Sequence, residues 1–195
     1  MTKKNIIMPI LVLVIICTVV AALLAGTNML TKDKIKENNI LKEQASLIKV
    51  LPTDVGFDHI YSASGEIEAD ADKLSDEIKA SLPKTVKDIY AEKNGAGYVF
   101  IMSTTTQFSK GEMIASVGVA GEKVTGATIT SYNETKDIGK DTYPSVFIGK
   151  TADDYGDVAL VSGATWSSTA FREEIIGAAL KASSVIISDG AEVVE

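Results

Sequence analysis

The stretch "YVFIMSTTTQFSKGEMIASVGVAGEKVTGATITSYN", residues 98–133, determines the expected fold class. It consists of short runs rich in Val, Ile, Thr and aromatic residues, and turn-forming segments at 109–112 and 121–122 separate these runs. Such runs with turn signals between them are typical of antiparallel strands joined by hairpins. A preceding run, "TVKDIYAEK" at 85–93, ends in the glycine-rich turn 94–97. The sequence therefore predicts an antiparallel meander of about four strands.

Helical patterns flank these runs on both sides. Before them, Leu74, Ile78 and Leu82 recur at every fourth position in "DADKLSDEIKASLP", which predicts a short helix. After them, helical spacing begins near Phe171 and Ile175 and continues toward the C-terminus. Helices before and after a run of strands indicate a single α+β domain.

An uncharged N-terminal segment precedes this domain. The run "IIMPILVLVIICTVVAALLAG" is long enough to cross the hydrocarbon core of a bilayer as a helix, and a cleavable signal peptide is the less favoured alternative. The flanking lysines nearly balance, so they do not decide topology. The expected organisation is a cytoplasmic N-terminus at 1–5, a transmembrane anchor at 6–27, a stalk or first helix at 28–52, and an extracytoplasmic domain at 53–195.

Composition excludes several kinds of function. The net charge is −7, and the chain beyond the apolar run carries 17 basic against 26 acidic residues, which disfavours a nucleic-acid partner. Cys17 and His59 are the sole residues of their types, so the chain cannot build a disulfide or a clustered Cys/His metal site. The glycine-rich phosphate-loop motif and the serine-hydrolase elbow are both missing from the sequence. We assign no catalytic residue and no metal ligand.

A [Ser/Thr]-Gly-Ala-Thr motif occurs twice, at 125–128 and at 162–165. The first copy lies within a predicted strand, where its backbone groups are expected to pair with a neighbouring strand. The second follows the run "VALV" at 158–161, which we interpret as a strand, and precedes the C-terminal helix. A helix N-terminus can hold an anion such as a phosphate. Small hydroxyl residues are also the commonest helix caps, so both interpretations stay open at this point.

At these motifs the chain resembles the FMN-binding RnfG proteins of the Rnf electron-transport complex, and it is similar to the NqrC proteins of the sodium-pumping NADH:quinone oxidoreductase. The resemblance covers nearly the whole chain. Besides the anchor, it rests on "LTKDKIKENN" at 30–39, "VLP" at 50–52, "GAGY" at 95–98, "NETKDIGK" at 133–140 and "SGATWSS" at 162–168. It implies an FMN-binding domain whose flavin is joined by a phosphodiester to Thr165. A flavin transferase that uses FAD as the donor would install this flavin.

The resemblance also implies a set of cofactor-binding residues around Thr165. These are Ser162, Gly163, Ala164, Trp166, Ser167 and Ser168 in the motif, and Glu134, Thr135 and Gly139 in the loop that corresponds to the family's E-T-P-G-L-G. The chain departs from the family at two places. Ala159 stands where an aspartate is usual, and Lys136-Asp137 replaces the Pro-Gly of the loop.

The resemblance implies an electron-transfer protein on the extracytoplasmic face of the cell membrane, with the other Rnf subunits as partners. Ferredoxin oxidation, NAD reduction and ion movement would then belong to the assembled complex, so whether the chain is classed as an enzyme is a matter of convention. Three alternatives remain: a stand-alone membrane-anchored electron shuttle, a component of the quinone-reducing relative, and a non-redox binding module whose second motif only caps a helix.

Overall fold

The computed structural model describes residues 12–18, 20, 45–65, 74–139 and 142–188. The chain divides into two units, Met1–Glu43 and Gln44–Glu195, and residues 12–18 of the first unit are helical. Within the described residues, no helix has both the length and the apolar character needed to span a membrane. Most of the anchor predicted at 6–27 and of the stalk predicted at 28–52 lies outside the described residues.

The second unit is built on a five-stranded antiparallel sheet whose spatial order follows the chain. Its strands are β1 (Phe57–Ser62), β2 (Val86–Glu92), β3 (Tyr98–Thr104), β4 (Met113–Ala120) and β5 (Lys123–Ser131). The predicted meander of four strands is confirmed as β2 to β5. The edge strand β1 was not predicted, because "FDHIYS" is half polar and a register shift between His59 and Tyr61 interrupts its alternation.

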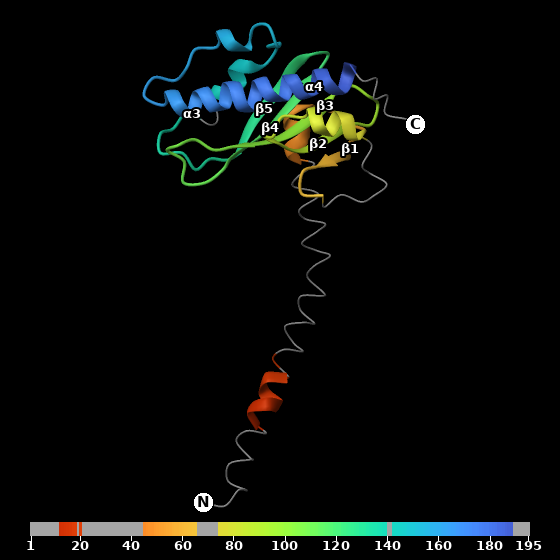
Figure 1. The fold of residues 1–195 in the computed structure, drawn as a ribbon, viewed down its shortest axis with the longest axis vertical. Helices are drawn as coiled ribbons and strands as arrows, with labels where there is room; N and C mark the ends of the chain where they lie inside the picture. The colour runs from red at the N-terminus through yellow and green to blue at the C-terminus, as the bar shows by residue number, and fades with distance from the viewer. Residues whose placement is uncertain (1–11, 19, 21–44, 66–73, 140–141, 189–195) are drawn as a thin grey trace, which may run out of the picture. The chain divides into compact units, whose positions relative to one another are not determined.

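Helices cover one face of the sheet, and they include the two helical segments predicted before and after the strands. The short helix α2 (Asp76–Ser81) begins at Ser75, whose side chain accepts from the Ile78 N–H. A continuous helical run then crosses the sheet as α3 (Thr165–Ala170), the π-helical segment η3 (Phe171–Gly177) and α4 (Ala178–Ser188) (Figure 1). The core between these layers contains fully buried side chains, among them Phe100, Phe147, Phe171, Met102, Met113, Ile175 and Ile176. Together these layers form the predicted α+β domain.

The helical segment 45–50 packs against the opposite face of the sheet. Leu47 and Val50 of this segment are buried in a second cluster with Leu51, Phe57, Tyr90 and Val99. Thr125 Oγ1 donates a hydrogen bond of 2.6 Å to the carbonyl oxygen of Val50. A Cβ atom added at Gly126 would lie 2.7 Å from the Val50 backbone. The first Gly-Ala-Thr copy is therefore strand structure, as predicted, and its Thr125 and Gly126 also hold this segment against the sheet.

The expectation of a strand at 158–161 is wrong, because these residues form a loop without a strand partner. Side chains bond to their backbone groups instead. Tyr143 donates from its hydroxyl to the Ala159 carbonyl at 3.3 Å, and Arg172 donates from Nη1 to the Val158 carbonyl at 3.0 Å. The apolar run before it, at 145–149, contributes to the 3₁₀ helix η1 (Tyr143–Phe147). The second motif thus follows a loop held by side chains.

Candidate functional site

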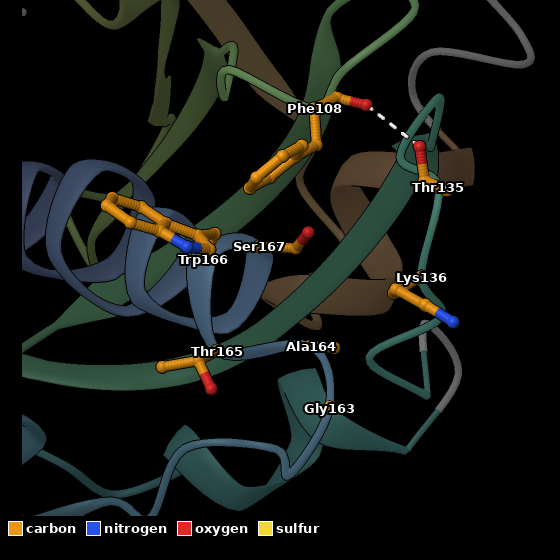
Figure 2. A pocket seen from close by; sticks show the side chains of 8 residues that line it. All are labelled: Phe108, Thr135, Lys136, Gly163, Ala164, Thr165, Trp166 and Ser167. Atoms are coloured by element: carbon orange, nitrogen blue, oxygen red, sulfur yellow. Dashed lines mark hydrogen bonds between the residues drawn. The ribbon is translucent and has the colours of Figure 1, made fainter.

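A pocket of about 250 Å³ lies where three segments of the second unit meet (Figure 2). The segments are the loop after β3, the loop after β5 and the start of α3. The lining residues are Phe108, Thr135, Lys136, Gly163, Ala164, Thr165, Trp166 and Ser167. Five of these eight come from the second Gly-Ala-Thr motif and the two residues that follow it. The structure therefore brings this motif to a cavity, whereas it places the first copy within the sheet.

The helix that carries Thr165 starts without a side-chain cap. Ala164 is the N-cap residue and makes no side-chain hydrogen bond, and Thr165 is the first helical residue. The first N–H groups of a helix have no partner within the helix, so they are available to an acceptor outside it. Gly163 has a φ of +79°, which few residues with a side chain adopt, and it has open space around it. The capping interpretation of the motif is not supported by this geometry.

The Thr165 side chain is exposed, and its hydroxyl has no hydrogen bond with any described residue. In Figure 2 this hydroxyl points outward from the helix start, beside Gly163 and Ala164. Ser168, by contrast, is fully buried. Its hydroxyl donates to the Ala164 carbonyl at 2.9 Å and accepts from the Val161 N–H at 3.1 Å, so it fixes the loop and the first turn. Ser168 and Ser162 are predicted site residues that do not line the pocket.

Two aromatic side chains form an exposed wall of the pocket. The rings of Phe108 and Trp166 meet edge to face, with centroids 6.3 Å apart and an interplanar angle of 67°. Phe108 is 53% exposed and Trp166 is 60% exposed, although large apolar side chains usually bury more of their surface. Phe108 was not predicted; its only sequence signal is a lone aromatic residue within the polar run 103–112.

The loop that holds Glu134, Thr135 and Gly139 lies beside the helix start. Glu134 Oε2 accepts a hydrogen bond from Ser167 Oγ at 3.0 Å, and Thr135 Oγ1 donates to the Phe108 carbonyl at 3.0 Å. Gly139, with a φ of +76°, is a turn residue whose carbonyl accepts from the Tyr143 N–H at 2.7 Å. Of these three residues, Thr135 lines the pocket, Glu134 contacts the lining residue Ser167, and Gly139 is outside the lining.

Lys136 is the charged residue of the pocket lining, and from the sequence it stood out only as a departure from the family loop. The Tyr132 hydroxyl donates to the Lys136 carbonyl and so ties this loop to the end of β5. Burial raises the pKa of Tyr132, so its phenol stays neutral at ordinary pH. Among the described residues, no three His, Cys, Asp or Glu side chains form a group that could hold a metal ion.

Comparison with known proteins identifies two regions of the chain. The model of the FMN-binding domain family matches residues 109–180, which include all of the pocket residues except Phe108. The model of the RnfG N-terminal region matches residues 1–50. No solved structure matches the chain.

A curated relative extends this likeness over most of the chain. It is the G component of the Na(+)-translocating ferredoxin:NAD(+) oxidoreductase complex of Acetobacterium woodii, which is 27% identical over 182 residues, covering 90% of this chain and 84% of the relative. The family match at 109–180, the N-terminal match and this relative agree with one another. The chain is therefore similar to RnfG proteins, with a match to the RnfG N-terminal region ahead of a match to the FMN-binding domain.

Proposed function

We propose that this chain is the FMN-bearing electron-transfer subunit of a membrane Rnf-type ferredoxin:NAD oxidoreductase complex, and that a phosphodiester joins its flavin to Thr165. The geometry of Thr165 is the observation that supports this attachment site. Its exposed hydroxyl stands at the first position of an uncapped helix and on the edge of a pocket. Both the acceptor oxygen and a place for the linked phosphate are thus present in one turn of chain.

The helix start favours the negative charge that a phosphodiester keeps. The N–H groups that open α3 and the positive end of the helix dipole both stabilise an anion at this position. In the attachment reaction, Thr165 Oγ1 forms a bond to the FMN phosphorus of FAD, the bond to AMP breaks, and the hydroxyl proton leaves with AMP or solvent. The protein gains the mass of FMN minus one water.

The pocket next to Thr165 fits a flavin in its chemistry. Phe108 and Trp166 supply apolar surface for a planar aromatic ring, and Thr135 and Ser167 supply polar groups at its side. When bound there, FMN supplies one-electron and two-electron transfer. The protein residues hold the ring, keep water from its covered face and set the charge around it.

The same proposal includes the chain's place in the cell. A single anchor at 6–27 holds the domain at 53–195 on the extracytoplasmic face, where covalent attachment prevents loss of the cofactor. The match to the RnfG N-terminal region supports this arrangement. Other Rnf subunits are the electron-transfer partners, and a flavin transferase acts during maturation. Ion translocation belongs to the assembled complex.

Mass spectrometry of the intact full-length protein, produced together with its flavin transferase, tests the attachment site. Thr128→Ala is the matched control, because Thr128 occupies the same place in the first motif copy but lies in β5 opposite Ser116. We expect one FMN minus water on the parent and on Thr128→Ala, and none on Thr165→Ala. Covalent flavin retained in Thr165→Ala would overturn the assignment.

A second experiment tests the partners. Mild solubilisation of membranes that contain the tagged full-length chain is expected to yield the other membrane subunits of the complex together with it. Recovery of the flavinylated chain alone, from cells that express those subunits, contradicts the Rnf assignment and favours a stand-alone electron shuttle.

A further inference from the structure

One carboxylate connects the three segments that form the pocket. Glu134 Oε2 accepts from Thr106 Oγ1 at 2.6 Å and from Ser167 Oγ at 3.0 Å. Thr106 lies two residues before Phe108, Glu134 directly precedes Thr135, and Ser167 directly follows Trp166. Each of the three hydrogen-bonded residues is therefore within two positions of a residue that lines the pocket. The network joins residues that are 28 and 33 positions apart in the sequence.

The direction of these hydrogen bonds determines what Ser167 offers to a ligand. An ionised carboxylate has no proton to donate, so the hydroxyl protons of Thr106 and Ser167 both point to Glu134. A serine hydroxyl carries one proton and two lone pairs, and the proton of Ser167 is used in this way. Ser167 lines the pocket, and Figure 2 shows its side chain projecting from the first turn of α3 toward the loop of Thr135. Toward the pocket, Ser167 can only accept a hydrogen bond.

The second oxygen of the same carboxylate has no partner. Glu134 Oε1 is buried and makes no hydrogen bond with the described residues. The other buried side-chain oxygens in this situation belong to hydroxyl groups, those of Thr85, Ser116 and Ser183. A buried acceptor without a hydrogen bond is costly, above all when it carries charge, so native proteins rarely keep one without a role for it. Glu134 does not itself line the pocket, so its carboxylate acts on a bound ligand through Ser167 and through its charge.

We propose that Ser167 is a hydrogen-bond acceptor of this pocket, and that Glu134 positions Ser167 and places its negative charge beside the bound flavin. This inference rests on the function proposed above. Ser167 would accept this hydrogen bond from an N–H of the flavin ring or from a hydroxyl of the ribityl chain. Thr106 is a further positioning residue, because its hydroxyl donates to the same carboxylate oxygen.

A negative charge beside a redox group disfavours the uptake of electrons, because electron addition makes the group more negative. The carboxylate of Glu134 therefore lowers the midpoint potential of the attached flavin. Glutamine at this position has nearly the same shape and keeps one acceptor oxygen, but it lacks the charge. Glu134→Gln is expected to shift the midpoint potential to a more positive value while the protein stays folded.

The test measures the midpoint potential of the covalent flavin in the full-length protein, with flavin content from intact mass and folding from the thermal unfolding midpoint. Glu122→Gln is the control for loss of one negative charge. Glu122 lies in the turn before β5, and the nine residues of β5 separate it from the Glu134 loop by about 30 Å. We expect a positive shift in Glu134→Gln, a smaller positive shift in Ser167→Ala, and none in Glu122→Gln.

The outcomes separate this inference from the proposed function. A parent protein without covalent flavin contradicts the proposed function itself. A flavinylated parent whose potential equals that of flavinylated Glu134→Gln overturns the role inferred for Glu134. If Glu134→Gln folds but does not accept flavin, the midpoint potential of flavinylated Ser167→Ala is the deciding measurement. This variant retains the Glu134 carboxylate and removes the Ser167 hydroxyl. An unchanged potential in that variant then overturns the inference, and a positive shift supports it.

Discussion

Thr125 Oγ1 donates a hydrogen bond to the carbonyl oxygen of Val50, 75 positions earlier in the sequence, at a distance of 2.6 Å. This bond satisfies a carbonyl at the end of the helical segment 45–50, where helix carbonyls lack partners within the helix. Gly126, the next residue, leaves the space that the Val50 backbone occupies. The first Gly-Ala-Thr copy thus joins the sheet to the chain segment that arrives from the N-terminal region.

Gly126→Ala is expected to loosen this contact. The new Cβ would lie 2.7 Å from the Val50 backbone, which is closer than carbon atoms tolerate, so strand or segment must shift. Overpacking of this kind costs about 1–3 kcal/mol and lowers the thermal unfolding midpoint by roughly 2–10 °C. Gly156→Ala is the control, because nothing lies within 4 Å of its added Cβ. Equal midpoints for the two variants of the full-length protein would contradict the close contact.

Gly163→Ala is expected to reduce flavin attachment. Gly163 has a φ of +79°, and forcing alanine into this region costs about 1–2 kcal/mol, which displaces the turn two residues before Thr165. Gly149→Ala carries the same strain at a φ of +83° and also has open space, but it lies outside the pocket. Intact mass should show less covalent flavin in Gly163→Ala alone. The prediction fails if both variants carry the same fraction of flavin.

Trp166 is the sole tryptophan of the chain and provides a direct probe of the pocket. It is 60% exposed and directly follows Thr165, so a flavin on Thr165 lies within quenching range of its indole ring. The flavinylated parent should show much weaker tryptophan emission than Thr165→Ala, and iodide should quench Trp166 readily in the latter. Phe108→Ala should increase that iodide quenching, because it removes the ring that covers one edge of Trp166. Equal emission with and without covalent flavin contradicts a pocket-bound ring.

Glu92 should contribute to stability in a pH-dependent way. Its buried carboxylate accepts from Thr53 Oγ1 at 2.8 Å, the Asn94 N–H at 2.8 Å and the Ala96 N–H at 3.0 Å. The Ala96 N–H is the main cause of a pKa below the ordinary value of 4.5, and it outweighs the opposing effect of burial. The folded state holds the proton more weakly than the unfolded state. The stabilisation is therefore complete above pH 4.5 and declines as the pH falls below it.

Glu92→Gln is accordingly expected to lower the thermal unfolding midpoint at pH 7, and the difference from the parent should shrink below pH 4.5. Asp153→Asn, at an exposed turn position, is the control and should change the midpoint little at either pH. A Glu92→Gln deficit that stays the same from neutral to strongly acidic pH would show that the glutamate acts through packing rather than through its charge.

Much of the architecture was readable from local patterns. Strands β2 to β5, the short helix α2 and the C-terminal helix follow from alternation, turn residues and helical spacing, since each pattern lies within a few residues of chain. The edge strand β1 was missed, and the loop at 158–161 was wrongly expected to be a strand. A four-residue apolar run such as "VALV" is compatible with a strand, but its backbone here bonds to the side chains of Tyr143, Arg172 and Ser168.

For the site, the amino-acid sequence was enough to single out the motif that carries Thr165 and the loop that carries Glu134 and Thr135. The packed fold was needed to show that Phe108 and Lys136 line the same pocket and that Thr106 and Ser167 share one carboxylate oxygen of Glu134. It was also needed to show that one Gly-Ala-Thr copy packs against Val50 while the other opens a helix beside a pocket. Identical short motifs have the same local preferences, so their different roles arise from partners that are distant in sequence and reach them only when the sheet and the helices pack.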